Sequence, residues 1–291
     1  MKASLLVDAP ILDKKQIWVK KVHKPFFDHD YHFHQTEEIC WIQSGHGNMV
    51  VGDHLGHFEK DDVLIFGKGL PHILRCDKSF EQKNSKKKTT AYSIYFTEEH
   101  IQSITDDPSM IKNLQQLLRK NERGYRLTGK EKEKALQLFT QVINSNGFGQ
   151  LGFLLQLLEL LLHCQQHSVL ASGNYQLLPS DTDMKRFSEV YDYLLKNFQQ
   201  PISLDQVASI CSMTTNSFCR FFKVKTQKTF VQFLTEIRIG HACKLLQDEN
   251  LPIKNIVYDC GFNNPVLFHR SFLRITGTTP KKFRDGLMNL S

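Results

Sequence analysis

An internal repeat in the last third of the chain limits the possible folds more strongly than any other feature of the sequence. Two segments share a pattern of apolar and cationic residues at an offset of 49, which becomes 50 after one extra residue in the second turn. The matched pairs are Leu204 and Ile253, Val207 and Ile256, Ala208 and Val257, Cys211 and Cys260, Phe218 and Phe268, Arg220 and Arg270, Phe222 and Phe272, and Thr226 and Thr276. This repeat predicts two similar helical units within one domain.

Each repeat has the pattern of a short helix, a tight turn and a capped second helix. Ser203, with Gln206 three residues later, fits a capping box, in which each side chain satisfies a free backbone N–H. Thr214 is a suitable cap for the second helix of the first unit, and Asn264 followed by Pro265 is suitable in the second unit. This order predicts two helix-turn-helix units.

The second helix of each unit has an apolar face and an opposite face suited to DNA. Phe218 and Phe222 share one side of the first helix, as Phe268 and Phe272 do in the second, so we expect all four in the core. On the opposite side, Arg can pair with guanine, Asn with adenine, and apolar atoms with the thymine methyl. The candidate DNA-binding residues, including flanking phosphate contacts, are Thr215, Asn216, Cys219, Arg220, Lys223, Val266, His269, Arg270, Arg274 and Lys281.

The distribution of charge favours a polyanionic partner for this part of the chain only. Residues 184–291 carry 15 Lys and Arg against 8 Asp and Glu, whereas residues 1–183 carry 22 of each. The formal net charge of +7 therefore lies entirely in the last third. Further candidates for phosphate contacts are Lys225, Lys228 and Lys282. An ordinary helical domain with a solvated basic surface is the simpler alternative.

The sequence before the repeat changes character twice. In residues 1–105, short β-branched and aromatic runs alternate with Gly, Asp and His, which predicts a small antiparallel β domain. Residues 106–167 have helical periodicity and are expected to form a helical extension. Residues 168–183 are rich in Ser, Gly, Asn and Pro, so we expect a linker there, followed by an all-α domain in residues 184–291. The predicted fold class is α+β.

One segment of the helical extension, from Leu151 to Cys164, is apolar on nearly every side. Such a helix must be buried, either inside its own domain or against a second copy of the chain, and we favour a homodimer. The segment is shorter than the roughly 20 residues of a transmembrane helix, and Gln156 and Glu159 interrupt it. The amino terminus lacks a secretory pattern and the seven Cys residues form no CxxC pair, so we expect a cytoplasmic protein without membrane contact.

The residues of the repeat resemble one known family. The segments ISLDQVASICSM, NSFCRFFK, RIGHACKLLQD, IKNIVYDCGFNNPVLFHRSF and GTTPKKFR are similar to the DNA-binding domain of AraC/XylS-type transcriptional regulators, over about residues 185–287. The resemblance implies about seven helices, with recognition helices near residues 215–225 and 265–275, and it places the base-facing positions among the candidates named above. Ser212 and Gln227 stand where the family commonly has glycine.

The first domain resembles, less specifically, the cupin-like sensory β-barrel of many of these regulators. The pattern H-x-H-x3-E-x6-G covers His32, His34, Glu38 and Gly45, and the segment DDVLIFGKGLPH ends in His72. In metal-binding cupins the corresponding three His and one Glu hold a divalent metal, and imidazole and carboxylate suit such ions. In a regulator the same residues can instead line an effector pocket. We expect a small-molecule effector there and no bound cofactor.

Three functions are compatible with these patterns. The preferred hypothesis is a non-enzymatic, sequence-specific regulator of transcription, in which an effector in the barrel controls how a homodimer binds double-stranded DNA and contacts RNA polymerase. The alternative is a metal-dependent cupin enzyme with an attached DNA-binding domain, using His32, His34, Glu38 and His72. A third hypothesis is an architectural protein that binds DNA without sequence preference.

Overall fold

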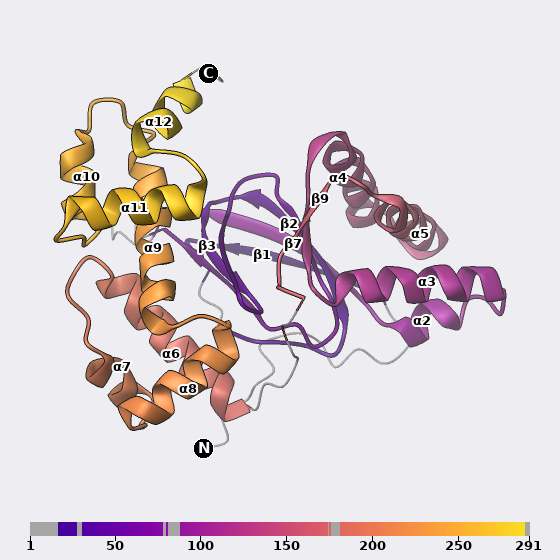
Figure 1. The fold of residues 1–291 in the computed structure, drawn as a ribbon. Helices are drawn as coiled ribbons and strands as arrows, with labels where there is room; N and C mark the ends of the chain where they lie inside the picture. The colour runs from indigo at the N-terminus through magenta and orange to yellow at the C-terminus, as the bar shows by residue number, and fades with distance from the viewer. Residues whose placement is uncertain are drawn as a thin grey trace. The chain divides into compact units, whose positions relative to one another are not determined.

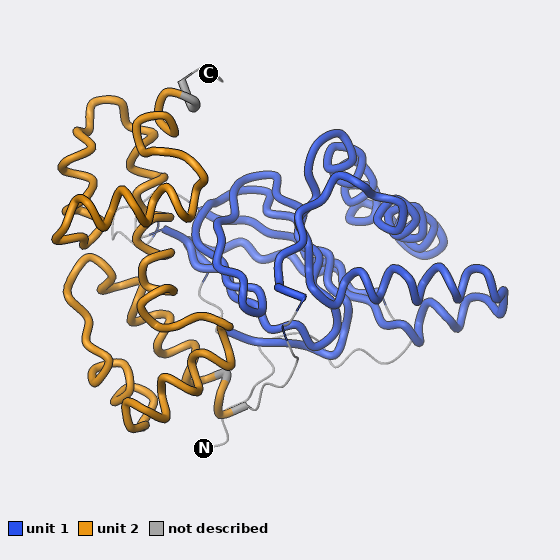
Figure 2. Tube along the Cα trace, in the orientation of Figure 1, with its two compact units in different colours: residues 1–181 blue, residues 182–291 orange. Residues whose placement is uncertain are grey.

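The chain forms two compact units, Met1–Asp181 and Thr182–Ser291, called unit 1 and unit 2 below (Figure 2). The computed structural model describes residues 17–27, 31–77, 80, 88–173, 175 and 181–288. Within these residues, unit 1 combines strands with helices, whereas unit 2 contains helices alone (Figure 1). The structure therefore confirms the α+β class that the sequence predicts.

Unit 1 is built on two antiparallel sheets. In the described part of the chain the larger sheet has the strand order β1–β7–β2–β5–β8–β9, and the smaller sheet has the order β4–β3–β6. The strands are β1 (Trp18–Lys24), β2 (Glu37–Ser44), β3 (Gly47–Val51), β4 (His54–Phe58), β5 (Val63–Phe66), β6 (His72–Cys76), β7 (Thr89–Phe96), β8 (Tyr125–Leu127) and β9 (His167–Val169). All of these pairings are antiparallel, as the short alternating runs of the sequence predict.

Side chains of the larger sheet alternate between two cores, because successive residues of a strand point to opposite faces. Ile39, Ile65 and Ile94 pack against the helices of unit 1. Cys40 and Ile42 point the other way and join the core between the two sheets. The space between the sheets is therefore lined by one face of the larger sheet, and polar residues placed on that face lie inside unit 1.

Helices of unit 1 cover the outer face of the larger sheet (Figure 1). They are α2 (Glu98–Gln102), α3 (Pro108–Asn121), α4 (Gly129–Asn144) and α5 (Gly147–His163). Leu117, Phe139 and Leu157, from three different helices, share one buried cluster with Ile39 and Ile65 of the sheet. The helical extension is therefore packed onto the β domain and shares a buried core with the outer face of the larger sheet.

The apolar helix α5 buries one side within unit 1 and leaves its beginning exposed. Leu154, Leu158 and Leu161 are buried. Phe148, in contrast, is 94% exposed. Of the two alternatives for this helix, packing inside its own domain is observed for one face, and contact with a second copy stays a prediction. No helix in the described ranges is long and apolar enough to cross a membrane.

The segment after α5 stays attached to unit 1. Leu170 and Ala171 are buried in the core between the sheets, and the Ser172 N–H donates to Asp53 Oδ1 at 2.8 Å. The next helix, α6, begins at Asp181. Ordered structure therefore extends into the predicted linker range from both ends, because Leu170 and Ala171 supply apolar surface that a solvated linker would expose. The rest of that range, residues 174 and 176–180, lies outside the described residues.

Unit 2 is organised around one central helix. Its described helices are α6 (Asp181–Asn197), α7 (Leu204–Ile210), α8 (Thr215–Thr226), α9 (Phe230–Leu245), α10 (Ile253–Asp259), α11 (Pro265–Thr276) and α12 (Pro280–Met288). Phe222 of α8 contacts Phe230 and Phe233 at the start of α9, with ring centroids 5.8 and 5.2 Å apart. Phe268 of α11 shares a core with Ile239 and other residues from the second half of α9. One helix thus fixes both repeats relative to each other (Figure 1).

Candidate nucleic-acid interface and ligand pocket

Both repeats of unit 2 contain the same type of turn between their two helices. Ser212 in the first turn and Gly261 in the second have left-handed φ angles of 54° and 78°. In the first turn the Met213 N–H donates to the Ala208 carbonyl at 2.9 Å, and the second turn repeats this bond. This is the Schellman pattern, which ends one helix and redirects the chain into the next. The non-glycine residue at position 212 therefore has the backbone conformation that the family resemblance associates with glycine.

The predicted helix caps are present. The Ser203 hydroxyl accepts from the Gln206 N–H at 3.2 Å, and the Gln206 side chain accepts from the Ser203 N–H at 2.8 Å. Thr214 and Asn264 accept backbone N–H groups from the first turns of α8 and α11. Because capping fixes where each helix begins, it also fixes which side chains each helix presents outward. The four Phe residues of the repeat are buried as predicted: Phe218, Phe222, Phe268 and Phe272.

Nearly all candidate DNA-binding residues lie on exposed surface opposite this core. The exposed ones are Asn216, Cys219, Arg220 and Lys223 of α8, Val266, His269, Arg270 and Arg274 of α11, and Lys281 of α12. Thr215 is half-buried, and its hydroxyl donates to Asp205 Oδ1 at 2.6 Å, which holds α8 against α7. The structure thus brings all candidates except Thr215 and Lys281 onto the outward faces of the two second helices, and the contacts of all candidates with DNA stay predictions.

Two lysines that the sequence suggests for phosphate contacts form ion pairs within the protein. Lys225 Nζ lies 2.9 Å from Asp183 Oδ2, and Lys228 Nζ lies 2.6 Å from Glu236 Oε2. Both lysines are partly buried, so these pairs hold α8 and the following turn to α6 and α9. Lys282 is exposed, as is its neighbour Lys281. The sequence therefore suggests more basic residues for phosphate contacts than the fold leaves available. Residue spacing alone does not show which acidic side chains pair with them.

The end of α6 packs against the second turn. Arg238 Nε of α9 donates to the Phe198 carbonyl at 2.8 Å. A Cβ added at Gly261 would lie 2.6 Å from the same carbonyl oxygen and 2.8 Å from that of Gln199. Position 261 therefore requires glycine both for its positive φ and for this close approach of two backbones.

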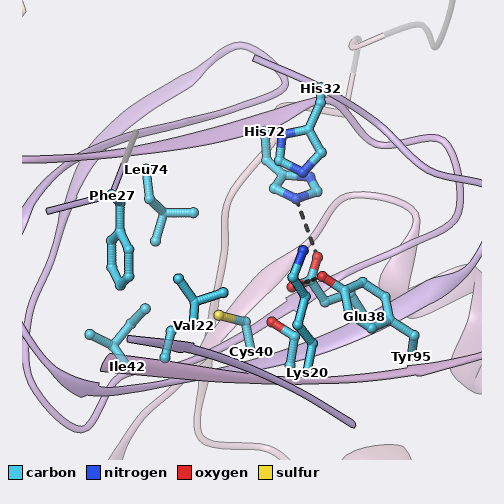
Figure 3. A pocket seen from close by; sticks show the side chains of 12 residues that line it. Lys20, Val22, Phe27, His32, Glu38, Cys40, Ile42, His72, Leu74 and Tyr95 are labelled. Carbon is cyan, nitrogen blue, oxygen red and sulfur yellow. Dashed lines mark hydrogen bonds and ion pairs between the residues drawn. The ribbon is translucent and has the colours of Figure 1, made fainter. Parts of the chain in front are cut away.

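In unit 1, a cavity of about 60 Å³ lies between the two sheets (Figure 3). Its polar lining residues are Lys20, His32, Glu38, His72, Ser93 and Tyr95, and its remaining lining residues are Val22, Phe27, Cys40, Ile42, Leu74 and Ala91. In Figure 3 Glu38, Lys20 and Tyr95 lie to one side, and Phe27, Leu74 and Ile42 lie to the other. On this scale one water needs about 10–15 Å³, so the cavity admits a ligand of only a few non-hydrogen atoms or a few waters.

Three of the four residues predicted for this pocket converge on one point. The ligand atoms of His34, Glu38 and His72 all lie within 4.8 Å of one another. Glu38 Oε2 lies 2.8 Å from His34 Nε2 and 3.3 Å from His72 Nε2. His32 is their neighbour, with its ring centroid 4.5 Å from that of His72, and it stands outside this three-residue group.

Backbone carbonyls orient both imidazole rings of the group. His34 Nδ1–H donates to the Thr36 carbonyl at 2.8 Å, and His72 Nδ1–H donates to the Leu70 carbonyl at 2.9 Å. Because a carbonyl oxygen can only accept, Nδ1 carries the proton in each ring, and Nε2 is aimed at Glu38. An imidazole held in this way can donate from Nε2 to the carboxylate or offer the Nε2 lone pair to a cation.

Glu38 is ionised although it is buried. Burial alone would raise the pKa of Glu38, but hydrogen bonds and electrostatic interactions with His34 and His72 outweigh this and hold the pKa well below its usual value. The Tyr95 hydroxyl donates to Glu38 Oε1 at 3.1 Å. Burial and the Glu38 charge raise the pKa of Tyr95, so the phenol remains a donor. The pocket therefore contains a fixed negative charge surrounded by donors.

Sequence patterns did not identify Lys20, Cys40 or Tyr95 as lining residues. Each lies on the same strand face as other lining residues, two positions from Val22, Ile42 and Ser93 respectively. The alternation of side chains within each strand could have placed these residues on the lining face. The pairing of the strands, which brings these faces together, could not be read from the sequence.

The paired, capped helix-turn-helix units define unit 2 as a DNA-binding domain of the helix-turn-helix class. Residues 207–286 match the family model described as a helix-turn-helix domain. The sequence motifs of this region are similar to those of AraC/XylS-type DNA-binding domains.

Curated relatives agree with this assignment in the same region. The HTH-type transcriptional activator RhaR of Escherichia coli strain K12 is 30% identical over 107 residues, which are 37% of this chain and 38% of RhaR. The chain therefore spans less than half the length of the curated relatives it matches.

Solved structures that resemble the chain include two named regulators. The DNA-binding domain of AdpA, solved with a target DNA, is 25% identical, with 35% of this chain and 91% of that chain covered and a TM-score of 0.33. ToxT from Vibrio cholerae is 12% identical, with 92% and 97% covered and a TM-score of 0.36.

Proposed function

We propose that this protein is a sequence-specific regulator of transcription that binds double-stranded DNA through both helix-turn-helix units. The observation that carries the proposal is the pair of exposed arginines, Arg220 and Arg270, at equivalent positions of two capped helices that share the α9 scaffold. An arginine at this place in a recognition helix can make a bidentate contact with guanine in the major groove. Two such helices on one scaffold read two parts of one site, about one DNA turn or roughly 34 Å apart.

The polar and charged outward residues then divide into two roles. Asn216 and Arg220 of α8, and His269 and Arg270 of α11, face the base edges. Lys223, Arg274 and Lys281 contact phosphates and hold the register of the protein on the duplex. The excess of basic residues in residues 184–291 supports this division of roles.

The decisive experiment selects binding sites from random DNA with the full chain and then compares variants on the selected site. We expect a two-part motif, in which Arg220→Ala relaxes one part and Arg270→Ala the other, each at a cost of about 1–3 kcal/mol. Lys185→Ala is a matched control, because Lys185 is an exposed cation of α6 in the same unit. Salt-sensitive binding without any motif would contradict the proposal and favour an architectural protein.

We also propose that the cavity of unit 1 binds the effector, and that the effector is a small amphipathic molecule. The volume of about 60 Å³ limits its size, and the separation of polar from apolar lining residues supports a ligand with one polar and one apolar end. Propionate, propylamine and propanol are suitable probes, because they share an apolar tail and differ in the charge of the head group.

Trp18 provides a signal for this binding test, since its ring stacks on pocket-lining Tyr95 with a centroid distance of 5.4 Å. A binding probe should change Trp fluorescence and raise the melting temperature of unit 1 with concentration. Ala91→Leu fills the cavity from the strand opposite Ile42 and should abolish both effects. If none of the three probes has an effect that Ala91→Leu removes, the proposed ligand class is wrong.

A divalent metal at His34, Glu38 and His72 is the second candidate occupant. The observation in its favour is that both Nδ1–H groups donate to backbone carbonyls, the arrangement that usually orients metal-binding imidazoles. A metal with an open coordination position would polarise a bound water or substrate, which is the chemistry of the alternative enzyme hypothesis. Elemental analysis of the purified chain, before and after dialysis against a chelator, distinguishes a metal site from a metal-free pocket. About one metal per chain, lost in His72→Ala, supports the metal; a metal-free protein that still binds its DNA motif excludes it.

We further propose that the regulator is a homodimer that assembles through α5 and activates transcription by contacting RNA polymerase. The exposed Phe148 and the half-buried Leu155 and Leu162 support the dimer, because α5 has apolar surface remaining outside the unit 1 core. The AraC/XylS type of unit 2 supports the contact with polymerase.

A further inference from the structure

The two recognition helices of unit 2 share an arginine but differ on either side of it. At the repeat offset of 50, Arg220 of α8 corresponds to Arg270 of α11. Asn216 of α8, however, is matched by Val266. In the same way, Lys223 is matched by Leu273, so two polar residues in the first helix are replaced by two apolar residues in the second.

On α11, the residues Val266, Arg270 and Leu273 form one outward stripe. Val266, Arg270 and Leu273 are spaced i, i+4 and i+7, which places them on one side of a helix. The buried Phe268 and Phe272 occupy the opposite side. Val266 is 75% exposed and Leu273 is 49% exposed, although aliphatic side chains of this size are usually buried. The centre of this outward face is therefore a cation between two exposed apolar side chains.

We propose that α11 reads thymine methyl groups on both sides of a guanine, whereas the equivalent positions of α8, Asn216 and Lys223, make hydrogen bonds. Val266 and Leu273 contact the methyl groups, and Arg270 contacts the guanine. This inference rests on the proposed function, since it requires that α11 enter the major groove. The C5-methyl of thymine is the apolar group that the major groove presents, so it is the base feature that aliphatic side chains can recognise.

The surroundings of the stripe favour DNA over a protein partner. Arg270 lies within it, and Arg274, Lys281 and Lys282 are exposed on α11 and α12. The central part of a protein–protein interface is usually depleted of charge, whereas a protein surface that binds DNA is polar and rich in positive charge. In the internal repeat, the residues of the stripe also hold the positions of α11 that correspond to the outward polar residues of α8.

The test uses the full chain and a site selected from random DNA, in which each thymine is replaced in turn by deoxyuridine. This change removes the methyl group and keeps every hydrogen-bonding group of the base. Arg270→Ala and Arg220→Ala first identify which part of the site each helix contacts. We expect deoxyuridine to weaken binding about fourfold at each methyl contacted by α11, the effect of exposing one methyl-sized group. Replacements in the α8 part should leave affinity unchanged.

Variants at the stripe assign the effect to individual side chains. Val266→Ala and Leu273→Ala should each remove the preference for thymine over deoxyuridine at one position, with the rest of the motif retained. Val231→Ala is the matched control, because Val231 is 64% exposed on α9, outside both recognition helices. All three changes lie on the surface, so the fold of unit 2 should be retained.

Three outcomes would overturn the inference, and they differ in what they say about the proposed function. A two-part motif without any deoxyuridine effect in the α11 part refutes methyl readout and leaves the regulator intact. If Leu273→Ala then lowers transcription by RNA polymerase in vitro with unchanged DNA affinity, the stripe contacts a protein instead. If no motif is selected at all, the proposed function fails and this inference fails with it.

Discussion

Exchanging the residues of the two helix-turn-helix turns tests how unit 2 is stabilised. Ser212 and Gly261 hold equivalent positions with positive φ, but only the first has a side chain. We therefore expect Ser212→Gly to stabilise unit 2 and Gly261→Ser to destabilise it by a larger amount. The asymmetry arises because the second turn is in close contact with the end of α6, where Phe198 lies, and the first turn has an exposed residue.

The magnitudes follow from two backbone terms and one steric term. A left-handed conformation costs an L-residue about 1–2 kcal/mol, whereas glycine loses about 0.4–1 kcal/mol more conformational entropy on folding. Ser212→Gly should therefore gain about 0.5–1 kcal/mol. Gly261→Ser reverses these terms and adds a Cβ 2.6 Å from the Phe198 carbonyl oxygen, an overlap that backbone movement must relieve. With about 1–3 kcal/mol for such overpacking, the total loss is roughly 1.5–4 kcal/mol.

The two units can be followed separately in one denaturation experiment. Both Trp residues of the chain, Trp18 and Trp41, belong to unit 1, so Trp fluorescence reports unit 1 alone. Circular dichroism at the helical band reports unit 2 together with the helices of unit 1. For a domain of about a hundred residues, 1 kcal/mol corresponds to roughly 4 °C in melting temperature. The dichroism transition should therefore rise by about 2–4 °C in Ser212→Gly, with no change in the fluorescence transition.

Two results would refute this reasoning. If Ser212→Gly is neutral or destabilising, the left-handed conformation at Ser212 carries no net strain. If Gly261→Ser is tolerated, the second turn moves away from α6 at little cost, and the close approach to Phe198 is not a fixed part of unit 2. A shift of the fluorescence transition in either variant would show that the two units do not unfold independently.

Other substitutions test the core, the pocket and the dimer. Phe222→Ala should cost unit 2 about 3–5 kcal/mol by dichroism, because the ring is buried among other aromatic residues, whereas exposed Val224→Ala should change stability by less than about 0.5 kcal/mol. Glu38→Gln should destabilise unit 1 by about 2 kcal/mol at neutral pH through weaker hydrogen bonds from the two His residues, as followed by Trp41 fluorescence. Since the folded pKa of Glu38 is depressed, the stability that its charge contributes is present above its usual pKa of 4.5 and is lost as the pH falls through the folded pKa. The gap between wild type and Glu38→Gln should therefore narrow below pH 4.5; a constant gap would contradict this. Phe148→Ser should dissociate the proposed dimer in sedimentation velocity and leave the melting temperature of the dissociated chain unchanged; a monomeric wild type would refute the dimer.

Local signals predicted unit 2 well because its structure depends on short-range interactions. Ser203 and Gln206 are three residues apart, and Thr214 and Asn264 cap the helices that begin directly after them. A pair such as Phe218 and Phe222 is placed in the core by helical periodicity alone. Each of these features involves residues within one or two helical turns of one another, so the sequence contains the complete physical argument.

Features that depend on distant residues were not predictable in the same way. Tyr125–Leu127 and His167–Val169 form strands of three residues, too short to show a period of two, and they exist because β5 and β8 offer free edges. The ion pair of Lys225 with Asp183 joins two helices whose packing no local pattern reveals. In each case the missing information is which segments fold side by side.

The pocket shows where this boundary between local and long-range information lies. Its motif residues His32, Glu38 and His72 were predicted, but its wall arises from the register of three neighbouring strands. In β7, Ser93 pairs with Lys20 of β1 on one side and with Cys40 of β2 on the other. The next rows on the same face are Val22, Ala91 and Ile42 in one direction, and Tyr95 with Glu38 in the other. A slip of one residue in either pairing would turn a whole row away from the cavity. The polar end of the pocket is therefore specified by strand pairing as much as by the histidine motif, and residues on β1 and β7 determine which ligand the motif can accept.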